Sequence, residues 1–250
     1  MKILGALIDS LPDQETPVRG ICAGARWTVV TTRGTGMSTT YRDPDLQGGH
    51  DSRGIPDAGQ LLGQPARALL AHARSTDTLA ASIGMATVNS LLDVDEARCT
   101  PRGAFDILAE RGRGRNVAVV GHFPFVPKLR EHARHVWVIE KQPRPGDFPE
   151  RQAARILPRC EVVCLTGTAF INHTLEDLLA LCRDSYVVLT GPTSPLSPVL
   201  FEFGIDAICG TRVVDADEVT RFVSQAATFQ QIHGHGVRLL TLTRETRRRP

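Results

Sequence analysis

Small hydrogen-bonding residues gather at one predicted strand-to-helix turn, within the sequence LTGTAFINHTL. They are Thr166, Gly167, Thr168, Asn172 and Thr174. A plain connection needs only a glycine and a capping residue, and Asn172 or Thr174 could serve as the cap. A cap does not account for the other members of the group. Hydroxyl, amide and backbone N–H groups in front of a helix suit a polar or anionic ligand.

A second polar turn follows the next apolar run, where residues 191–198 read GPTSPLSP. Its prolines restrict the backbone, so that the hydroxyl groups between them would be held in place. A rigid polar loop suits a binding site, and it also suits a connector before a short helix. We predict that it contributes Gly191, Pro192, Thr193 and Ser194 to a ligand site.

Two histidines and one acid lie at comparable positions. His122 follows an apolar run that ends at Gly121, His173 lies in the first polar turn, and Glu140 ends another apolar run. Imidazole and carboxylate groups at such positions can transfer protons or bind metal. We predict that Gly121, His122, Phe123, Pro124 and Glu140 contact the ligand. His122, Glu140 and His173 are also catalytic candidates, and the two histidines are metal-ligand candidates. The alternatives are histidines with a structural role and a solvated strand end.

The position of Glu140 also raises the question of a nucleotide. It comes 19 residues after Gly121, the spacing at which an acid contacts the ribose in dinucleotide-binding folds. The G-x-G-x-x-G fingerprint is missing, because the sequence GHFPFV supplies a single glycine. Phe123 and Pro124 would obstruct a pyrophosphate, so the sequence disfavours NAD. Glu140 still leaves open a nucleoside- or S-adenosylmethionine-dependent enzyme.

Other metal-ligand pairs have unfavourable spacing. Cys160 and Cys164 would lie roughly 13 Å apart along a predicted strand, which is too far for one ion. His233 and His235, about 6.6 Å apart if extended, fit a solvated loop better than a metal site. The six cysteines lie mostly in apolar runs, where a thiol packs as a small hydrophobe.

Alternating strands and helices must position these residues. Short runs rich in Val, Ile and Leu, separated by segments with helical potential, indicate a parallel sheet covered on both faces. The predicted strands are residues 116–121, 135–140, 161–167, 185–191 and 206–210. Right-handed crossovers then give a Rossmann-like α/β domain. Since ligands bind at the carboxyl ends of such strands, the polar turns should meet along one edge.

The first part of the chain has a different pattern. Alternation around the sequence RGTG predicts a β-hairpin, and residues 63–73 and 77–93 read as helices. Strands followed by helices indicate a smaller α+β domain. The charged, glycine-broken sequence ERGRGRN is the expected boundary, which gives domains of residues 1–112 and 113–250.

Two residues of the first domain could reach a cleft shared with the second. Gly36 in the hairpin would permit close backbone approach. Asn89, in an otherwise small and apolar helix, would be a polar group in the cleft. A helix-surface amide is the alternative for Asn89.

Four segments of the second part resemble the DUF364 family of proposed heavy-metal chelation domains. They are VVGHFPF, VWVIEKQPRPGDFP, VVCLTGTAFINHTLEDLL and VVLTGPTSPLSPVLFEFGIDAICGTRVVD. The upstream stretches ARWTVVTTRGTGMSTTYRD and ASIGMATVNSLL look like the companion domain DUF4213, which has an enolase N-terminal-like fold. The resemblance covers nearly the whole chain. It implies a Rossmann-like domain after an α+β domain, a shared cleft, and the handling of a divalent metal ion or a metal-binding small molecule.

We therefore expect a protein that binds a small polar, anionic or metal-chelating molecule in the cleft between the domains. The alternative is an enzyme, a lyase or a transferase, that acts on a small metabolite at the same cleft.

Composition restricts the partners. A net charge of +2 and 5% aromatic residues give neither a global field nor a stacking platform for nucleic acid. The basic tail, residues 244–249, is typical of a solvated terminus. No apolar run has the length of a membrane span or a secretory signal. We expect a cytoplasmic protein with neither nucleic-acid nor membrane partners, and a homodimer because such assemblies are the commonest.

Overall fold

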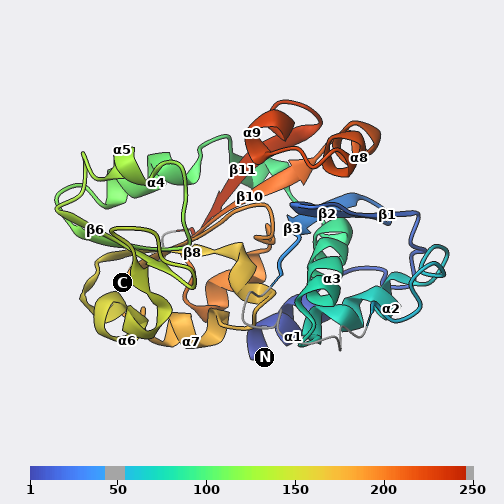
Figure 1. The fold of residues 1–250 in the computed structure, drawn as a ribbon, viewed down its shortest axis with the longest axis horizontal. Coiled ribbons are helices and arrows are strands. Elements are labelled where there is room, and N and C mark those ends of the chain that lie inside the picture. Colours follow the sequence, from blue (N-terminus) through green and yellow to red (C-terminus); the bar gives the residue numbers. More distant parts are fainter. Residues whose placement is uncertain (43–53, 246–250) are drawn as a thin grey trace.

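The computed structural model of the chain describes residues 1–42 and 54–245, which form two sheets lying side by side (Figure 1). A three-stranded antiparallel sheet comes from the first part of the chain, and an eight-stranded mixed sheet comes from the rest. This is the predicted fold class, a Rossmann-like domain preceded by a smaller α+β domain. Asp43 of the hairpin stretch and residues 246–249 of the basic tail lie outside the described residues.

The small sheet lies between two helices. Its strands, in spatial order, are β1 (Gly20–Ala23), β2 (Trp27–Thr31) and β3 (Thr35–Thr39). On one face lies α3 (Thr78–Leu91), and on the other lies α8 (Ala216–Ser224), which comes from the far end of the chain. The predicted hairpin and both predicted helices are present, the first helix as α2 (Ala66–Leu70) and the 3-10 helix η2 (Ala71–Arg74).

Gly36 brings β3 onto α3. A Cβ atom at this position would lie 2.1 Å from the carbonyl oxygen of Ala86 and 2.3 Å from the backbone nitrogen of Ser90. No side chain fits such a gap, so strand and helix are in backbone contact here. The start of α3 is fixed by Asp77, whose carboxylate accepts hydrogen bonds from the N–H groups of Leu79 and Ala80.

The large sheet has the order β4-β11-β10-β9-β8-β5-β6-β7. Its strands are β4 (Cys99–Thr100), β5 (Asn116–Val120), β6 (His135–Glu140), β7 (Phe148–Pro149), β8 (Val162–Thr166), β9 (Tyr186–Thr190), β10 (Ala207–Val213) and β11 (Val237–Thr243). The five predicted strands correspond to β5, β6, β8, β9 and β10, with ends shifted by no more than three residues. They pair in parallel, as expected.

An antiparallel edge is the main departure from the predicted parallel sheet. β11 pairs with β10 in antiparallel register from Ala207–Thr243 to Val213–Val237, and β4 adds a short pairing on its outer side. α8 and α9 (Phe229–Ile232) precede β11, but they cover the small sheet instead of forming a crossover on the large one. The chain therefore returns along β10 in the opposite direction.

Helices cover both faces of the large sheet. On one face lie α4 (Ala104–Arg111) and α5 (Val126–Leu129), packed on the valines of β5 and β6. On the other lie α6 (Ala153–Ile156), α7 (Leu175–Ala180) and α1 (Lys2–Asp9). Short 3-10 helices complete the connections: η3 (Glu96–Arg98), η4 (Glu150–Gln152), η5 (Leu157–Arg159), η6 (Gly167–Phe170) and η7 (Pro198–Phe203).

The two parts of the chain share apolar cores. Met85 and Leu91 of α3 belong to the same buried cluster as Leu196 and Leu200 of the second part. Val29 of β2 belongs to another, together with the buried residues of β10, α8 and β11. The expected domain boundary at residue 112 stays a prediction, and α4, which ends just before it, packs on β8 and β9. None of the helices in the described part of the chain has the length and apolarity of a membrane span.

Candidate functional site

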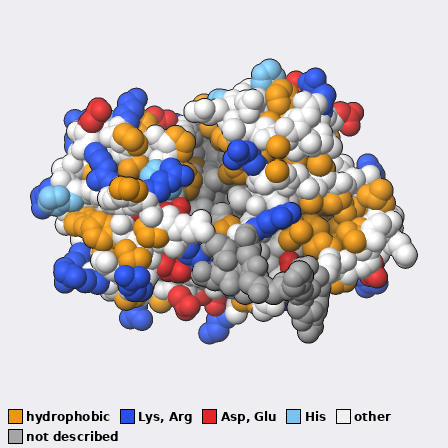
Figure 2. All heavy atoms as spheres, in the orientation of Figure 1, with side chains coloured by type: hydrophobic (Ala, Val, Ile, Leu, Met, Phe, Trp, Pro, Cys, Tyr) orange, Lys and Arg blue, Asp and Glu red, His pale blue; other side chains and the backbone are white. Residues whose placement is uncertain are grey.

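The strand order of the large sheet defines where a crevice can open. From β5 the chain crosses to β6 on one side, and it then returns to β8 on the other side and continues outward through β9 and β10. The loops after β5 and β8 therefore diverge, and ligands of parallel α/β sheets bind at such a point. A cavity of about 770 Å³ lies there, between the sheet edge and the β2–β3 hairpin. Figure 2 shows the surface hollowed between the two halves of the molecule.

Most of the residues predicted to bind a ligand line this cavity. They are Gly121, His122, Phe123, Pro124, Glu140, Thr166, Gly167, Thr168, Asn172, Thr174, Gly191, Pro192 and Thr193. The strands bring these loops together as expected, because β5, β6, β8 and β9 point the same way. Gly36, Asn89, His173 and Ser194 do not line it. That these residues bind a ligand stays a prediction.

Glycine is required at two of the strand ends. Gly121 after β5 has φ of +104°, and Gly191 after β9 has φ of +112°. A Cβ atom at Gly121 would also lie 3.1 Å from Cβ of Thr166. The left-handed backbone turns each chain sharply at the end of its strand, and this directs the following polar loop along the cavity.

Glu140 joins two neighbouring strand ends. Its Oε1 accepts the backbone N–H of His122 at 2.8 Å, and its Oε2 accepts the N–H of Lys141 at 3.0 Å. Both oxygens thus hold main chain beside the cavity. The geometry therefore favours a supporting role for Glu140 over the two roles considered from the sequence, a contact with a ribose and a solvated strand end.

His122 is paired with an acid that the sequence analysis did not identify. Nδ1 of His122 lies 3.2 Å from Oδ2 of Asp147, and the same oxygen accepts the N–H of Arg144 at 3.0 Å. The side chain of Asp147 is only 4% exposed, whereas that of His122 is 30% exposed. Asp147 lies in a turn before the two-residue strand β7, where no periodicity marks it.

His173 contacts the first part of the chain and does not line the cavity. It lies outside the cavity lining, has φ of +60°, and its Nε2 lies 2.7 Å from the carbonyl oxygen of Ser75. A ring N–H that donates to a carbonyl links η6–α7 to the first part of the chain. The geometry favours the structural alternative over a catalytic or metal-binding role.

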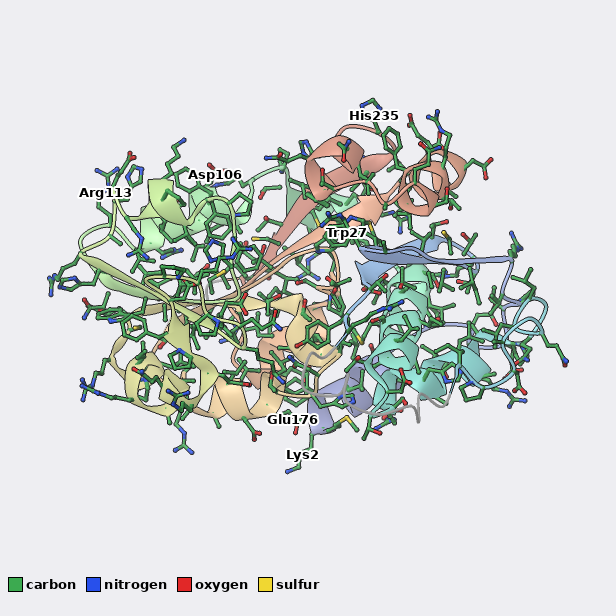
Figure 3. The ribbon with its side chains drawn as sticks, viewed as in Figure 1. Lys2, Trp27, Asp106, Arg113, Glu176 and His235 are labelled. Carbon is green, nitrogen blue, oxygen red and sulfur yellow. The ribbon has the colours of Figure 1, made fainter. Side chains whose placement is uncertain are left out.

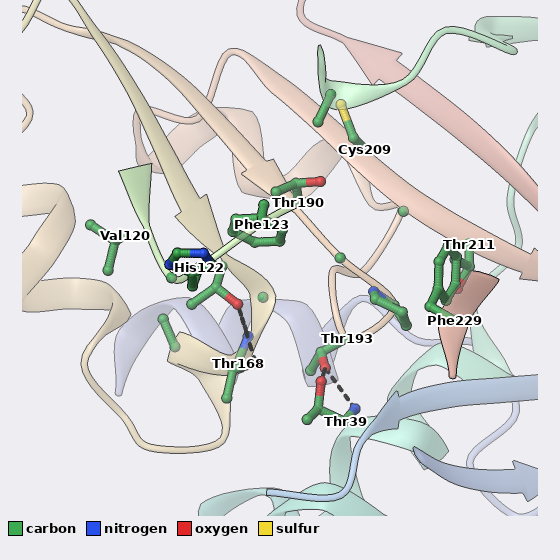
Figure 4. Close-up of a pocket in the computed structure, with 18 of the residues that line it drawn as sticks. Thr39, Val120, His122, Phe123, Thr168, Thr190, Thr193, Cys209, Thr211 and Phe229 are labelled. Carbon is green, nitrogen blue, oxygen red and sulfur yellow. Dashed lines mark hydrogen bonds between the residues drawn. The ribbon is translucent and has the colours of Figure 1, made fainter. Parts of the chain in front are cut away.

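Hydrogen bonds within the first polar turn are largely local. The hydroxyl of Thr166 accepts the N–H of Thr168 at 3.3 Å. Oδ1 of Asn172 accepts both the N–H and the hydroxyl of Thr174, at 3.3 and 2.8 Å, just before α7 begins. Asn172 therefore shapes the start of the helix, which was the alternative for it. The threonine side chains remain at the cavity wall, as Figure 4 shows for Thr168.

The second polar turn is bound to the hairpin. Thr193 accepts the N–H of Thr39 at 2.9 Å and donates its hydroxyl to that of Thr39 at 3.1 Å (Figure 4). From behind, the amide of Asn89 donates to carbonyl oxygens of Met37 at 2.9 Å and Thr193 at 3.3 Å. Asn89 thus supports the loop, and Gly36 approaches α3 instead of a ligand. Ser194 is buried, and a Cβ atom on the neighbouring Gly167 would lie 2.6 Å from its hydroxyl oxygen.

The opposite wall of the cavity is largely aromatic and was not predicted. Trp27 of β2 and Phe229 of α9 meet edge to face with centroids 5.8 Å apart, and the indole N–H donates to the carbonyl of Ala227 at 3.0 Å. Figure 3 places Trp27 where the two sheets meet, beneath α9. On the sheet side, Phe123 stacks on Phe125 at 5.2 Å. A ligand here would contact apolar surface over much of its body.

Further residues of the lining include three groups that lie apart in the sequence. They are Arg26 and Tyr41 beside the hairpin, Arg102–Phe105 before and within α4, and Cys209–Thr211 with Leu239 and Leu240 from β10 and β11. The carboxyl-end rule could have found Cys209, because it lies near the end of a predicted strand. No sequence signal joins Trp27 to Phe229.

The charges around the cavity include three cations. Arg102 pairs with Glu110 at 2.6 Å, and Lys141 lies 3.9 Å from Glu150. Arg26 has no ion-pair partner within the described ranges. Because Glu140 and Glu150 also line the cavity, Arg26 is the group that offers a charged partner to an anion.

The residues present do not fit a resident free metal ion. Within residues 1–42 and 54–245, no group of three or more His, Cys, Asp or Glu side chains could hold one. Burial raises the pKa of the Cys209 thiol to about 11, so this sulfur is protonated at neutral pH and is a poor ligand. Glu140 is already engaged by backbone N–H groups.

Comparison with known proteins agrees with this architecture. The family model of DUF364, described as "Putative heavy-metal chelation", matches residues 103–241, and that of DUF4213, with the same description, matches residues 5–92. A crystal structure of a DUF364 protein of unknown function from Desulfitobacterium hafniense is 27% identical, with a TM-score of 0.82 over 97% of this chain and 98% of the other. A second, from Pyrococcus horikoshii, is 15% identical, with a TM-score of 0.78 over 97% of each chain, and shows the fold alone. An uncharacterised protein of Methanocaldococcus jannaschii is 26% identical over 170 residues, which span 65% of this chain and 66% of that protein.

Proposed function

The chain belongs to the DUF364 family, and from this premise we propose that its cavity binds a small anionic, metal-chelating molecule, either free or loaded with metal. The observation that carries the proposal is the pairing of a large cavity with the absence, within the described residues, of any cluster that could hold an ion directly. The family description supplies the link to metals.

The size and walls of the cavity suit an organic molecule. About 770 Å³ lies within the range of small-molecule sites, roughly 300–1,000 Å³, and far exceeds the space that one ion needs. Trp27 and Phe229 on one side and Phe123 on the other offer aromatic surface for a planar or apolar body. Figure 4 shows Phe123 near the centre of the close-up and Phe229 at its right.

Charge supports an anionic head group. Arg26 is exposed and can swing toward a carboxylate, which guanidinium groups bind through two parallel hydrogen bonds. The backbone N–H groups of Gly121, His122 and Gly191 already donate to Ile139, Glu140 and Cys209, so the guanidinium would be the main partner of the anion.

Calorimetry with pyridine-2,6-dicarboxylate tests the proposal, because this molecule is aromatic, anionic and a metal chelator. We expect binding at one site and a higher melting temperature. Arg26→Ala should weaken binding roughly ten-fold to 100-fold, because a charged hydrogen-bond partner contributes about 1.5–3 kcal/mol. Arg221→Ala, which removes an exposed arginine of α8 that does not line the cavity, is the matched control and should bind as wild type.

Two results would contradict the proposal. One is the failure of this dicarboxylate, of citrate and of nitrilotriacetate to bind or to raise the melting temperature. The other is tight binding of metal ions alone that Arg26→Ala leaves unchanged. Benzene-1,3-dicarboxylate has the same shape and charge without the chelating nitrogen, so weaker binding of this compound would show selection for chelators.

An enzyme acting on a small metabolite, a lyase or a transferase, is the second candidate. The hydrogen bond between His122 and Asp147 favours it, since a carboxylate that orients an imidazole is a common arrangement for proton transfer. A screen of metabolites for turnover, repeated with His122→Ala, tests this candidate. Turnover that survives the substitution would rule out His122 as its acid–base group.

A further inference from the structure

The main chain of His122 is fixed from both sides. The residue follows Gly121, whose positive φ turns the chain at the end of β5, and its N–H donates to the Glu140 carboxylate at 2.8 Å. The imidazole therefore starts from a rigid strand end and lines the cavity. A side chain on main chain that is fixed in this way can be placed more accurately than one on a free loop.

The ring orientation is fixed by Asp147. Nδ1 of His122 lies 3.2 Å from Oδ2 of this buried carboxylate, and the N–H of Arg144 holds the same oxygen at 3.0 Å. An ionised carboxylate only accepts hydrogen bonds, so Nδ1 carries the proton and Nε2 of the neutral ring carries a lone pair. Carboxylate–histidine pairs of this kind are typical of imidazoles that bind metal through the other nitrogen.

Cysteine is a weak competitor for metal in the cavity, and among residues 1–42 and 54–245 no second histidine lines it. Cys209 is the cysteine of the lining, and its thiol is buried and hydrogen-bonded to Thr241 at 3.2 Å. Within the described part of the chain, His122 is the histidine of the lining, and Nε2 has no hydrogen bond to a protein group. One imidazole cannot hold an ion in a protein by itself, but it can complete the coordination of an ion that is already chelated.

We infer that His122 Nε2 supplies one ligand to a metal ion that the bound chelator brings into the cavity, and that Asp147 is the positioning residue. The inference rests on the proposed function, since the chelator must enter the cavity first. The Nε2–metal bond forms in place of a bond to solvent water, which is released, and no oxidation or proton transfer accompanies it. Protein and small molecule together then provide the complete ligand set.

The complex of Cu²⁺ with pyridine-2,6-dicarboxylate is the probe. The chelator occupies three positions of a square and leaves the fourth to solvent, where an imidazole can bind. Pulsed electron paramagnetic resonance detects the remote nitrogen of a coordinated imidazole, and calorimetry gives the affinity. We expect wild type to bind the copper complex at least ten-fold more tightly than the metal-free chelator and to give the imidazole signal.

His122→Ala should lose both the affinity gain and the signal, so that it binds the copper complex no more tightly than it binds the metal-free chelator. His135→Ala is the matched control, because His135 is an exposed histidine at the opposite end of β6, and it should keep both. Asp147→Ala should lower affinity for the copper complex roughly ten-fold to 100-fold and leave the metal-free chelator unaffected. Asp147→Asn keeps an acceptor for Nδ1–H and should lose less, which guards against a folding defect in the alanine variant.

The possible failures are distinguishable. If wild type binds the metal-free chelator but gains nothing from copper, or if the signal persists in His122→Ala, the inference is wrong and the proposed function stands. If wild type binds neither form, both are wrong. If Cu²⁺ alone binds at His122 as tightly as the complex does, the protein does not need the ligands of the chelator, and the inference is again wrong.

Discussion

The two walls of the cavity differ in how the chain builds them. The sheet-edge wall consists of successive strand ends, and its polar groups are fixed by hydrogen bonds such as those of Glu140 to two backbone N–H groups. The hairpin wall consists of aromatic side chains from distant segments, Trp27 and Phe229, fixed by packing. The first wall is suited to direct a polar group and the second to cover an apolar body. A ligand that fits both is amphipathic.

The largest effect should come from the contact that supports the hairpin wall. Gly36→Ala places a Cβ atom 2.1 Å from a carbonyl oxygen of α3, so strand and helix must separate. We expect a loss of about 3 kcal/mol or more in the free energy of unfolding, at the upper end of overpacking effects, and loss of ligand binding with it. Urea unfolding gives the first quantity and calorimetry the second.

Gly5→Ala is the control for this substitution. Gly5 lies inside α1, and a Cβ atom there meets nothing closer than 3.6 Å. Alanine at a helix interior should be neutral or stabilise the protein by about 0.5–1 kcal/mol. Equal stability of Gly36→Ala and wild type would show that the hairpin is free to move away from α3. The statement that packing fixes the hairpin wall would then be wrong.

A smaller effect should come from the aromatic pair itself. Trp27→Ala and Phe229→Ala should each weaken binding of pyridine-2,6-dicarboxylate, because each removes apolar surface from the cavity. In a double-mutant cycle on protein stability, the pair should show a coupling energy of about 0.5–1.5 kcal/mol. Additive effects on stability would mean that the edge-to-face contact does not hold the wall together.

The smallest effect should come from Cys209 on the sheet-edge wall. At neutral pH, ionisation of its thiol should make no difference to the free energy of unfolding. Burial raises the pKa of Cys209 from 9.0 to about 11, so folding favours the neutral thiol. Its contribution to stability is therefore fully present below pH 9 and is lost as pH rises from 9 to 11. Cys209→Ala should consequently flatten the fall in stability across this window.

Denaturation curves at several pH values measure this, and iodoacetamide labelling gives an independent check. Cys209 should react slowly at pH 8, and Cys22, which is half-buried and on the small sheet, should react faster. Rapid alkylation of Cys209 in the folded protein at that pH would contradict the assignment of a buried, protonated thiol.

The contrast between the walls also explains what the sequence could predict. A strand end is marked in the chain by a Val-rich run that stops at glycine, so Gly121 and Gly191 could be located, and parallel pairing placed their loops together. Asp147 follows the turn sequence PRPG and precedes a strand of two residues, so no periodicity pointed to it.

The aromatic wall depends on tertiary packing alone. Trp27 and Phe229 lie near opposite ends of the sequence, and they meet because α8 and α9 turn back over the small sheet. Because α8 and α9 cover the small sheet, the chain returns to the large sheet as the antiparallel strand β11. The alternation of strands and helices in the sequence did not indicate this. Asn89 was predicted as a polar group in the cleft. Its amide instead donates hydrogen bonds to carbonyl groups of β3 and of the second polar turn, so it supports these segments, which the sequence did not reveal.

The cores shared by the two parts of the chain determine how the molecule should unfold. Val29 and Met37 from the small sheet are buried against Val219 and Val223 of α8, so separating the halves would expose these side chains to water. Unfolding is then expected as one cooperative transition, with both sheets melting at the same temperature. A gene cut between the two sheets should yield fragments that aggregate when produced singly and regain structure only when mixed.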